Sequence, residues 1–407
     1  MPRNELIAGL DLGTTKACCV AAEVDERGQP VIVGVGVSPS RGIRRGNVVD
    51  IEATTRAVED AVNRASQQCG MPILSVYVGV TGEHIQSMNS RGVAAITHPD
   101  HEITEADRRR VLEQSRVIVI PPDRSVLHAI PRSYSVDGQE GIREPVGMCG
   151  SRLEVETHIV TGSQTFLLNV EKCVARAQLA LKEMVLEPLA TAYAVVTEAE
   201  RDLGVCVLDI GGGTTDIAVL ADGEITHSAV IPVGGNHVTN DIAQLLRVTT
   251  DEAERIKLHY GSALPGQVGD TESVELTQIG RTGSRPFRRR ALCEIIEARM
   301  QELLHMVKKE LLRAGCLEAM TSGLVLTGGG SLLHGVQQCA GDILRVPVRL
   351  GTPSGVGGLH DSVAEPMFST AVGLIHYALR SEEAARSAAP KGGMPGFLKW
   401  LKVFRPG

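Results

Sequence analysis

Aromatic side chains are scarce in this sequence of 407 residues, in which Phe, Trp and Tyr together make up 3%. Surfaces that bind single-stranded nucleic acid stack bases on such side chains, so the scarcity argues against that kind of partner. The formal net charge of −7 at pH 7 also argues against a general binder of polyanions. We therefore expect no nucleic-acid partner.

Paired cysteines and long apolar runs are lacking too. The nine cysteines form no C-x-x-C pair and their number is odd, which is typical of a reducing cytoplasm with buried thiols. No apolar run reaches the ~18 residues that could span a bilayer, and "MPRNELIAGLDLG" lacks the apolar centre of a signal peptide. The prediction is a soluble protein, or one attached to a membrane surface.

Several common catalytic motifs are absent. No lysine follows a glycine, which excludes the G-x-x-x-x-G-K-[ST] loop, and there is no G-x-G-x-x-G, G-x-S-x-G or H-E-x-x-H. The twelve histidines show no metal-ligand spacing. A chain of this length is expected to form two to four domains.

Two glycine turns are present instead. "GLDLGTTKACCV" at 9–20 and "LDIGGGTTDIAV" at 208–219 share one order: apolar strand, Asp, glycine turn, threonines, second strand. Each half also holds "EP" before a small-residue helix, at 187–196 and 365–375, and a third turn, "TGGGS", lies at 327–331. One glycine turn alone would be an ordinary hairpin. The repeated two-part pattern predicts two lobes of like topology.

These turns predict a phosphate site in a cleft between the lobes. Glycine lets backbone N–H groups approach an anion and form a nest around it. Asp11 and Asp209 end their strands there and would hold Mg²⁺ through its waters, although capping a turn is the ordinary role of such an Asp. Polar side chains would assist, namely the ammonium of Lys16 and the hydroxyls of Thr14, Thr15, Thr214 and Thr215.

The third turn, with Gly328, Gly329, Gly330 and Ser331, is expected to lead into a helix whose N-terminus receives the ribose, α-phosphate or base of a nucleotide. Opposite it, Glu254 and Lys257 lie three residues apart in "DEAERIKLHYGSA" and share one helix face. On spacing alone, a solvated ion pair is the simpler interpretation of these two residues.

Strand-rich and helix-rich stretches divide the chain into two lobes with an insertion. Residues 1–82 and 161–197 form the first lobe around an α+β subdomain at 83–160. The second lobe has its core at 198–240 and 316–364 and a helical subdomain at 241–315. A helix at 365–380 returns to the first lobe, and a flexible linker at 381–395 precedes an amphipathic helix at 396–407.

Two local signals support this division. Thr104 and Asp107 have the spacing of a capping box at the start of a helix in the inserted subdomain. Asp222 and Gly223 are typical of a tight turn between two strands of the second lobe.

The segments "GLDLGTTK", "LEPLATAYAVV", "LDIGGGTTDIAV", "LTGGGSLLHGV" and "EPMFSTAVGLI" resemble, in order, the nucleotide-site segments of the actin, Hsp70 and sugar-kinase superfamily. Within it, "VGVTG", "IPVGGNHVTNDIA" and "AERIK" resemble the bacterial FtsA family, although the family's "GDI" stands here as "GNVVDI". The resemblance implies an α/β, two-lobed, actin-like (ribonuclease-H-like) ATPase fold with an inserted α+β subdomain and a C-terminal amphipathic helix.

The same resemblance implies that ATP and Mg²⁺ bind between the lobes, and that Glu254 and Lys257 contact the nucleoside. Glu187 matches a position near the attacking water and is a candidate general base. The resemblance implies that hydrolysis is often weak, so ATP binding is expected whether or not turnover occurs. The predicted nucleotide-binding residues are Asp11, Gly13, Thr14, Thr15, Lys16, Gly211, Gly212, Gly213, Thr214, Thr215, Asp216, Gly235, Glu254, Lys257, Gly328, Gly329, Gly330 and Ser331.

Further implications of the resemblance concern cell division. They are self-assembly into actin-like filaments, tethering of the tubulin-like protein FtsZ to the cytoplasmic face of the membrane at the septum, and recruitment of later division proteins through residues 83–160. The FtsZ tail is implied to dock near "RTGSRPFRRR" at 281–290, which holds five arginines and no acid. The candidate residues are Arg285, Arg288, Arg289 and Arg290, and the alternative is a solvated loop.

The last twelve residues, "GFLKWLKVFRPG", predict a helix that lies on an anionic membrane surface. They follow a linker rich in Gly, Pro and Ala, which is unusual for a core helix. The residues expected to contact the membrane are Phe397, Leu398, Lys399, Trp400, Leu401, Lys402, Phe404 and Arg405.

Two alternatives within the superfamily stay open. One is an actin-like protein of pilus assembly, and the other is a small-molecule kinase. The kinase would need a carboxylate beside a bound hydroxyl, for which the sequence offers no clear candidate, and the tail argues against both.

Overall fold

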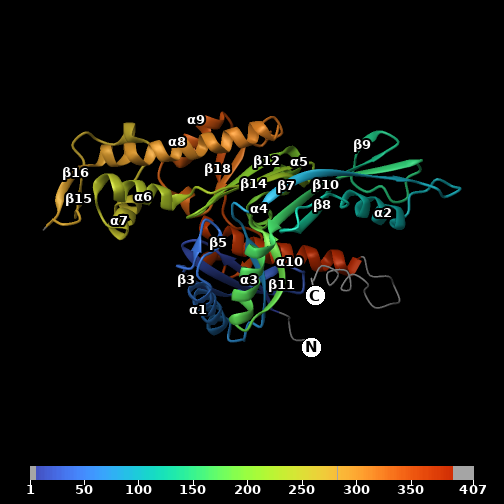
Figure 1. The fold of residues 1–407 in the computed structure, drawn as a ribbon, viewed down its shortest axis with the longest axis horizontal. Helices are drawn as coiled ribbons and strands as arrows, with labels where there is room; N and C mark the ends of the chain where they lie inside the picture. Colours follow the sequence, from blue (N-terminus) through green and yellow to red (C-terminus); the bar gives the residue numbers. More distant parts are fainter. Residues whose placement is uncertain (1–5, 282, 388–407) are drawn as a thin grey trace.

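The computed structural model describes residues 6–281 and 283–387, and two sheets of like strand order form the centres of its two lobes (Figure 1). The first sheet has the order β11-β6-β1-β2-β3-β19 and the second β14-β13-β12-β17-β18. The first comprises β1 (Ile7–Leu12), β2 (Lys16–Val24), β3 (Pro30–Pro39), β6 (Ser75–Val80), β11 (Ala180–Leu186) and β19 (Gly357–Gly358). The second comprises β12 (Val205–Ile210), β13 (Thr215–Ala221), β14 (Glu224–Ile231), β17 (Leu324–Thr327) and β18 (Val348–Leu350).

The repeat seen in the sequence is confirmed as a repeat of topology. In each lobe an antiparallel hairpin carries the glycine turn, β1 with β2 and β12 with β13. The first strand of each hairpin pairs in parallel with a strand from later in the chain, β6 or β17. Because β1 and β12 are central and buried along their whole length, their last residues are held rigidly.

Helices cover both faces of the first sheet. On one face lie α1 (Ile51–Cys69) and α3 (Gln164–Arg176), and on the other α4 (Glu187–Val195) and α10 (Ser369–Ser387). The helices α4 and α10 pack so closely that a Cβ added at Gly373 would lie 1.9 Å from the Ala190 carbonyl oxygen. Gly70, in the left-handed region at φ 71°, ends α1.

The second lobe also has helices, which lie beside its sheet (Figure 1). They are α5 (Glu198–Leu203), α6 (Gly235–Leu246), α7 (Thr250–Tyr260), α8 (Arg289–Arg313) and α9 (Val336–Leu344). A hairpin of β15 (Ser273–Leu276) and β16 (Arg285–Arg288) leads into α8, and a second small hairpin, β4 (Ile43–Arg44) with β5 (Asn47–Val48), belongs to the first lobe.

The inserted subdomain is a four-stranded sheet with one helix on its face. Its order is β7-β10-β8-β9, from β7 (Gln86–Ala95), β8 (Arg124–Val136), β9 (Gln139–Ile142) and β10 (Arg152–Ser163), with α2 (Glu105–Ser115) packed on β7 and β10. The predicted capping box is confirmed, since Thr104 and Asp107 satisfy each other's backbone N–H. The predicted turn at Asp222 and Gly223 joins β13 to β14 with φ of 55° and 88°.

Two expectations were wrong in detail. Residues 381–387, predicted as linker, continue α10. The third glycine turn leads first into a 3₁₀ turn, Gly329–Leu332, and α9 begins only after Gly335, which has φ 82° and interrupts the helical path.

None of the helices in the part of the chain that the structure describes is long and apolar enough to cross a membrane. The predicted membrane segment at 396–407 lies outside the described residues, with Phe397, Leu398, Lys399, Trp400, Leu401, Lys402, Phe404 and Arg405.

Candidate functional site

A cavity of about 120 Å³ lies where the two glycine turns meet. It is lined from both lobes, by residues 11–16 at the end of β1 and its turn, by Asp209 and residues 211–214 at the end of β12 and its turn, and by Gly328 and Gly329 after β17. Other lining residues are Gly46, Thr81, Glu187, Asp216, Pro366, Met367 and Thr370.

Asp11 and Asp209 occupy equivalent places in the two hairpins. Each is the next-to-last residue of the buried first strand, the two residues are 7% and 8% exposed, respectively, and both line the same cavity. The Asp209 Oδ2 atom accepts hydrogen bonds from Thr191 (3.1 Å) and Thr370 (3.3 Å), which lie on α4 and α10. The cleft thus brings together the two acids that the repeat predicted to face each other.

The two glycine turns pack directly against each other. A Cβ added at Gly212 would lie 2.5 Å from Thr15 Cγ2, and one at Gly213 would lie 2.4 Å from Thr14 Oγ1. Behind the second turn, the start of α6 donates from Gly235 N–H to the Gly211 carbonyl at 2.9 Å. Glycine at these two positions leaves room for the threonine side chains of the first turn.

Four buried carboxylates share the cavity. Burial raises the pKa of Asp11 to about 6 and the pKa of Asp209 above its usual range. The pKa values of Glu187 and Asp216 are raised well above theirs, by burial first and then by the neighbouring carboxylates. One of these acids, Asp216, accepts a hydrogen bond from the Thr81 hydroxyl. An excess of buried negative charge favours the uptake of a cation.

The donor set fits a hydrated Mg²⁺ ion. Oxygen ligands suit this ion, which keeps several of its waters in proteins. Among residues 6–281 and 283–387, no three His, Cys, Asp or Glu side chains converge as a direct metal site.

Lys16 is engaged inside the protein. Its Nζ atom donates to the Met367 carbonyl oxygen at 2.5 Å and lies 4.3 Å from the centre of the Phe368 ring. The ammonium therefore sits at the cavity wall, within reach of the first turn.

Glu254 and Lys257 form a second cluster beside the second turn. The Lys257 Nζ atom lies 2.7 Å from Glu254 Oε2 and donates to Thr239 Oγ1 (2.9 Å) and the Gly235 carbonyl oxygen (3.3 Å). Lys257 is only 8% exposed, so this pair is more than a solvated surface pair. The cluster touches the turn through Gly235 but does not line the cavity.

Three other predicted residues lie just behind the cavity wall. The Thr215 hydroxyl donates to the Val233 carbonyl at 2.7 Å, and the Ser331 hydroxyl donates to the Gly328 carbonyl at 2.6 Å. A Cβ at Gly330 would collide with Ile210. These positions shape the turns without presenting a side chain to the cleft.

The cavity residues that sequence reasoning missed are Leu12, Gly46, Thr81, Pro366, Met367 and Thr370. Thr81 carried a signal, since it follows the apolar strand of "VYVGV" as Asp11 and Asp209 follow theirs. Gly46 belongs to a short hairpin and had no such signal.

The basic segment at 281–290 divides into two parts. Arg289 pairs with Glu272 at 2.6 Å, and Arg290 pairs with Asp270. Arg285 and Arg288 lie on β16, are exposed, and make no ion pair with any residue that the structure describes. The segment itself contains no acidic residue, but acidic residues of the preceding loop form ion pairs with Arg289 and Arg290.

Two lobes built on the same hairpin motif, with a cleft between them, define an actin-like protein. Among solved structures, the "PilM-PilN type IV pilus biogenesis complex" matches with a TM-score of 0.66 and 17% identity over 92% of this chain and 98% of that one. MreB 5 of Spiroplasma citri bound to AMPPNP matches with a TM-score of 0.56 and 16% identity over 95% and 100%. At such identities these matches show the fold alone.

The family is shown by sequence relatives. The model of "Cell division protein FtsA" matches residues 206–373, and that of "SHS2 domain inserted in FTSA" matches residues 82–161. FtsA of Pseudomonas aeruginosa is 45% identical over 96% of this chain and 93% of its own, and FtsA of Escherichia coli is 38% identical over 98% and 96%. The chain belongs to the FtsA family of cell division proteins.

Proposed function

We propose that this chain binds Mg²⁺–ATP between its lobes and assembles into actin-like filaments that anchor the FtsZ ring to the cytoplasmic face of the membrane at the septum. The observation that carries the nucleotide part is the meeting of Asp11 and Asp209, from equivalent hairpins, at one cavity lined by both glycine turns. An actin-like relative in fold whose structure contains AMPPNP supports the choice of nucleotide.

Binding requires the lobes to separate. A cavity of about 120 Å³ is smaller than the roughly 300–1,000 Å³ of typical ligand sites. The turns touch through Gly213 and Thr14, so opening would part them and expose their N–H groups to the phosphates. Lys16, released from Met367, would turn to the same phosphates.

The proposed roles follow from position. The two glycine turns would hold the phosphates through Gly13, Thr14, Thr15, Lys16, Gly211, Gly212, Gly213 and Thr214. The nucleoside and α-phosphate would lie along Gly235, Glu254, Lys257, Gly328 and Gly329. Asp11 and Asp209 would hold the ion through its waters, and the bound Mg²⁺ would neutralise the phosphate charge.

Glu187 is the proposed general base. Burial and the neighbouring carboxylates raise the pKa of Glu187 well above its usual range, which disfavours the ionised form that a general base needs. A cation beside it would lower that pKa, so any turnover should increase with the bound ion.

Three surfaces would serve division. Residues 396–407 would bind anionic lipid, Arg285 and Arg288 would receive the acidic tail of FtsZ, and the inserted subdomain would recruit later division proteins. Arg289 and Arg290 are assigned to structure, because their guanidinium groups already pair with Glu272 and Asp270.

Electron microscopy on lipid monolayers tests the proposal. The full chain and a chain lacking residues 396–407 would be spread with Mg²⁺–ATP on anionic and on neutral lipid. Filaments on anionic lipid from the full chain alone are the expected result. Equal filament density from the shortened chain would contradict membrane anchoring by the tail, and no filaments from either chain would contradict assembly.

A further inference from the structure

The inserted subdomain is continuous in the chain with the first lobe, but it also packs against the second lobe. The junction with the first lobe is rigid because Arg124 donates from Nη2 to the carbonyl oxygens of His84 (2.7 Å) and Thr161 (2.9 Å). One side chain thus joins three segments of the chain. The His84 ring also stacks on Phe166 at 4.9 Å. The subdomain must therefore move with the first lobe.

One buried polar node joins the subdomain to the second lobe. The Ser228 hydroxyl on β14 lies 2.9 Å from His158 Nε2, and His158 Nδ1 lies 2.8 Å from Asn89 Oδ1. The Ser228 carbonyl accepts from the Ser87 hydroxyl at 2.7 Å. Ser228 and His158 are 3% and 1% exposed, respectively, so breaking this node would leave buried polar groups without partners.

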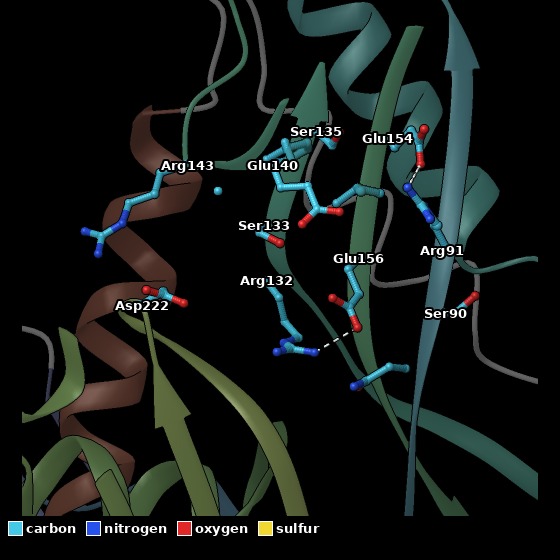
Figure 2. Close-up of a pocket in the computed structure, with 14 residues that line it drawn as sticks. Ser90, Arg91, Arg132, Ser133, Ser135, Glu140, Arg143, Glu154, Glu156 and Asp222 are labelled. Atoms are coloured by element: carbon cyan, nitrogen blue, oxygen red, sulfur yellow. Dashed lines mark hydrogen bonds and ion pairs between the residues drawn. The ribbon is translucent and has the colours of Figure 1, made fainter. Parts of the chain in front are cut away.

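Open space flanks the node. Grooves of about 820 Å³ and 470 Å³ lie next to it, and Asn89, Arg132 and Asp222 line both of them. Figure 2 shows Asp222, at the tip of the β13–β14 turn, facing Arg132 and Glu156 across the larger groove. The ion pair of Arg143 with Asp202 also bridges the two parts, but it is exposed and contributes little. The subdomain has room to rotate about the node.

Besides the hydrogen bonds of Thr191 and Thr370 to Asp209, another buried hydrogen bond crosses between the lobes at the cleft. The Thr81 hydroxyl donates to Asp216, and both residues are at most 5% exposed. Thr81 is the last residue of the first lobe before Gly82, at φ 134°, turns the chain towards β7. Asp216 and Ser228 lie on the same hairpin, in which Asp216 pairs with Val230 and Ala218 with Ser228.

We propose that the hydrogen bond from Thr81 to Asp216 is a latch, and that the node at Ser228 is the pivot about which the inserted subdomain turns when the latch opens. The trigger rests on the proposed function, since Asp216 lines the cleft and a bound ion and phosphates compete with Thr81 for its carboxylate. When the hydrogen bond between Thr81 and Asp216 breaks, the lobes separate while Ser228 keeps its hydrogen bonds to His158 and Ser87. The angle between the subdomain and the second lobe then reports the state of the cleft.

The test is a distance measurement by pulsed electron paramagnetic resonance on the full chain. Cys149 is an exposed native cysteine in the inserted subdomain, and a Leu312→Cys change at the exposed end of α8 supplies the partner label. Cys69→Ser removes a partly exposed thiol, and the remaining seven cysteines are buried. The distance between the labels reports the width across the grooves.

Mg²⁺–ATP and, separately, Thr81→Val without nucleotide are expected to shift the mean distance in the same direction. Thr81→Ser keeps the hydroxyl and should leave the distance unchanged. If Thr81→Val gives the wild-type distribution in a chain that melts normally, the latch is disproved. If calorimetry detects no Mg²⁺–ATP binding while Thr81→Val still shifts the distance, the proposed function fails and the latch stands.

Ser228→Ala provides an independent test should Thr81→Val not fold. It removes the pivot at a position outside the cleft, so the distance distribution should broaden in either nucleotide state. A distribution as narrow as that of the wild type would overturn the role of the node.

Discussion

Gly328 lies where a side chain cannot be accommodated. Its φ is 81°, and an added Cβ would lie 2.1 Å from Asp209 Oδ1 and 2.7 Å from the Ile210 carbonyl oxygen. The backbone therefore supports one of the two acids of the cleft by direct contact. Gly315 has a comparable φ of 66° but no atom within 4 Å of its added Cβ.

Gly328→Ala should therefore lower both stability and nucleotide binding. Positive φ and the collision together should cost about 3 kcal/mol or more, whereas Gly315→Ala should cost only about 1 kcal/mol from its backbone. Chemical denaturation and ATP titration of both variants provide the measurement. Equal losses of stability in the two variants would show that the contact with Asp209 is unimportant.

His158, which belongs to the pivot, makes the free energy of unfolding depend on pH. Burial, with help from His227 and Arg132, lowers its pKa to about 3, whereas an unfolded histidine binds a proton below about 6.5. The unfolded state then holds more protons between these values, so stability is complete above pH 6.5 and is lost as the pH falls. By this linkage, the loss at pH 5 is about 2 kcal/mol.

His158→Gln keeps a polar side chain but cannot titrate. Between pH 7.5 and pH 5 the wild type should lose about 2 kcal/mol more unfolding free energy than this variant. Urea unfolding at the two pH values measures the difference. A parallel loss in both proteins would assign the acid sensitivity to other groups, such as His128, whose pKa burial lowers to about 4.

At the scale of elements, sequence patterns predicted those helices, turns and hairpins that depend on neighbouring residues. The hairpins β1–β2 and β12–β13 and the capping box of α2 depend on neighbouring residues and were correct. The end of α10 was misjudged, although Glu382, Glu383, Ala384 and Ala385 are helix formers and the next proline is Pro390. The small and polar residues of this segment are typical of a linker, but their helix propensity is the better guide to its structure.

Contacts between distant segments could not be predicted. Thr81 reaches Asp216 across 135 positions, and nothing in either segment alone indicates the other. The basic segment before α8 posed the same difficulty, because Glu272 and Asp270 neutralise two of its arginines from outside it.

The two parts of that basic segment should respond differently to mutation. Arg285→Ala with Arg288→Ala should weaken binding of an acidic FtsZ tail peptide at unchanged melting temperature, because these side chains are exposed and lack local ion pairs with described residues. Arg289→Ala with Arg290→Ala should mainly lower the melting temperature. Fluorescence titration and thermal unfolding distinguish the two outcomes, and the reverse assignment would contradict the division.

At the scale of the whole molecule, the two lobes are variations on one sheet. The order β3-β2-β1-β6-β11 corresponds to β14-β13-β12-β17-β18, so the ends of β1 and β12 are brought to face each other. Each lobe then adds what the other lacks: an inserted subdomain in the first and a helical subdomain in the second (Figure 1). The repeat in the sequence carried this information, which is why the architecture was predictable while the closed state of the cleft was not.

The most direct test is calorimetric titration of Mg²⁺–ATP into the full chain and into Asp11→Asn and Asp209→Asn. Since both acids are proposed to hold the hydrated ion, the wild type should bind and each variant should lose affinity at least about tenfold, equivalent to ~1.4 kcal/mol. ATP in the presence of a magnesium chelator should bind all three proteins similarly. No heat with the wild type, or wild-type affinity in both variants, would contradict a nucleotide–magnesium unit held from both lobes.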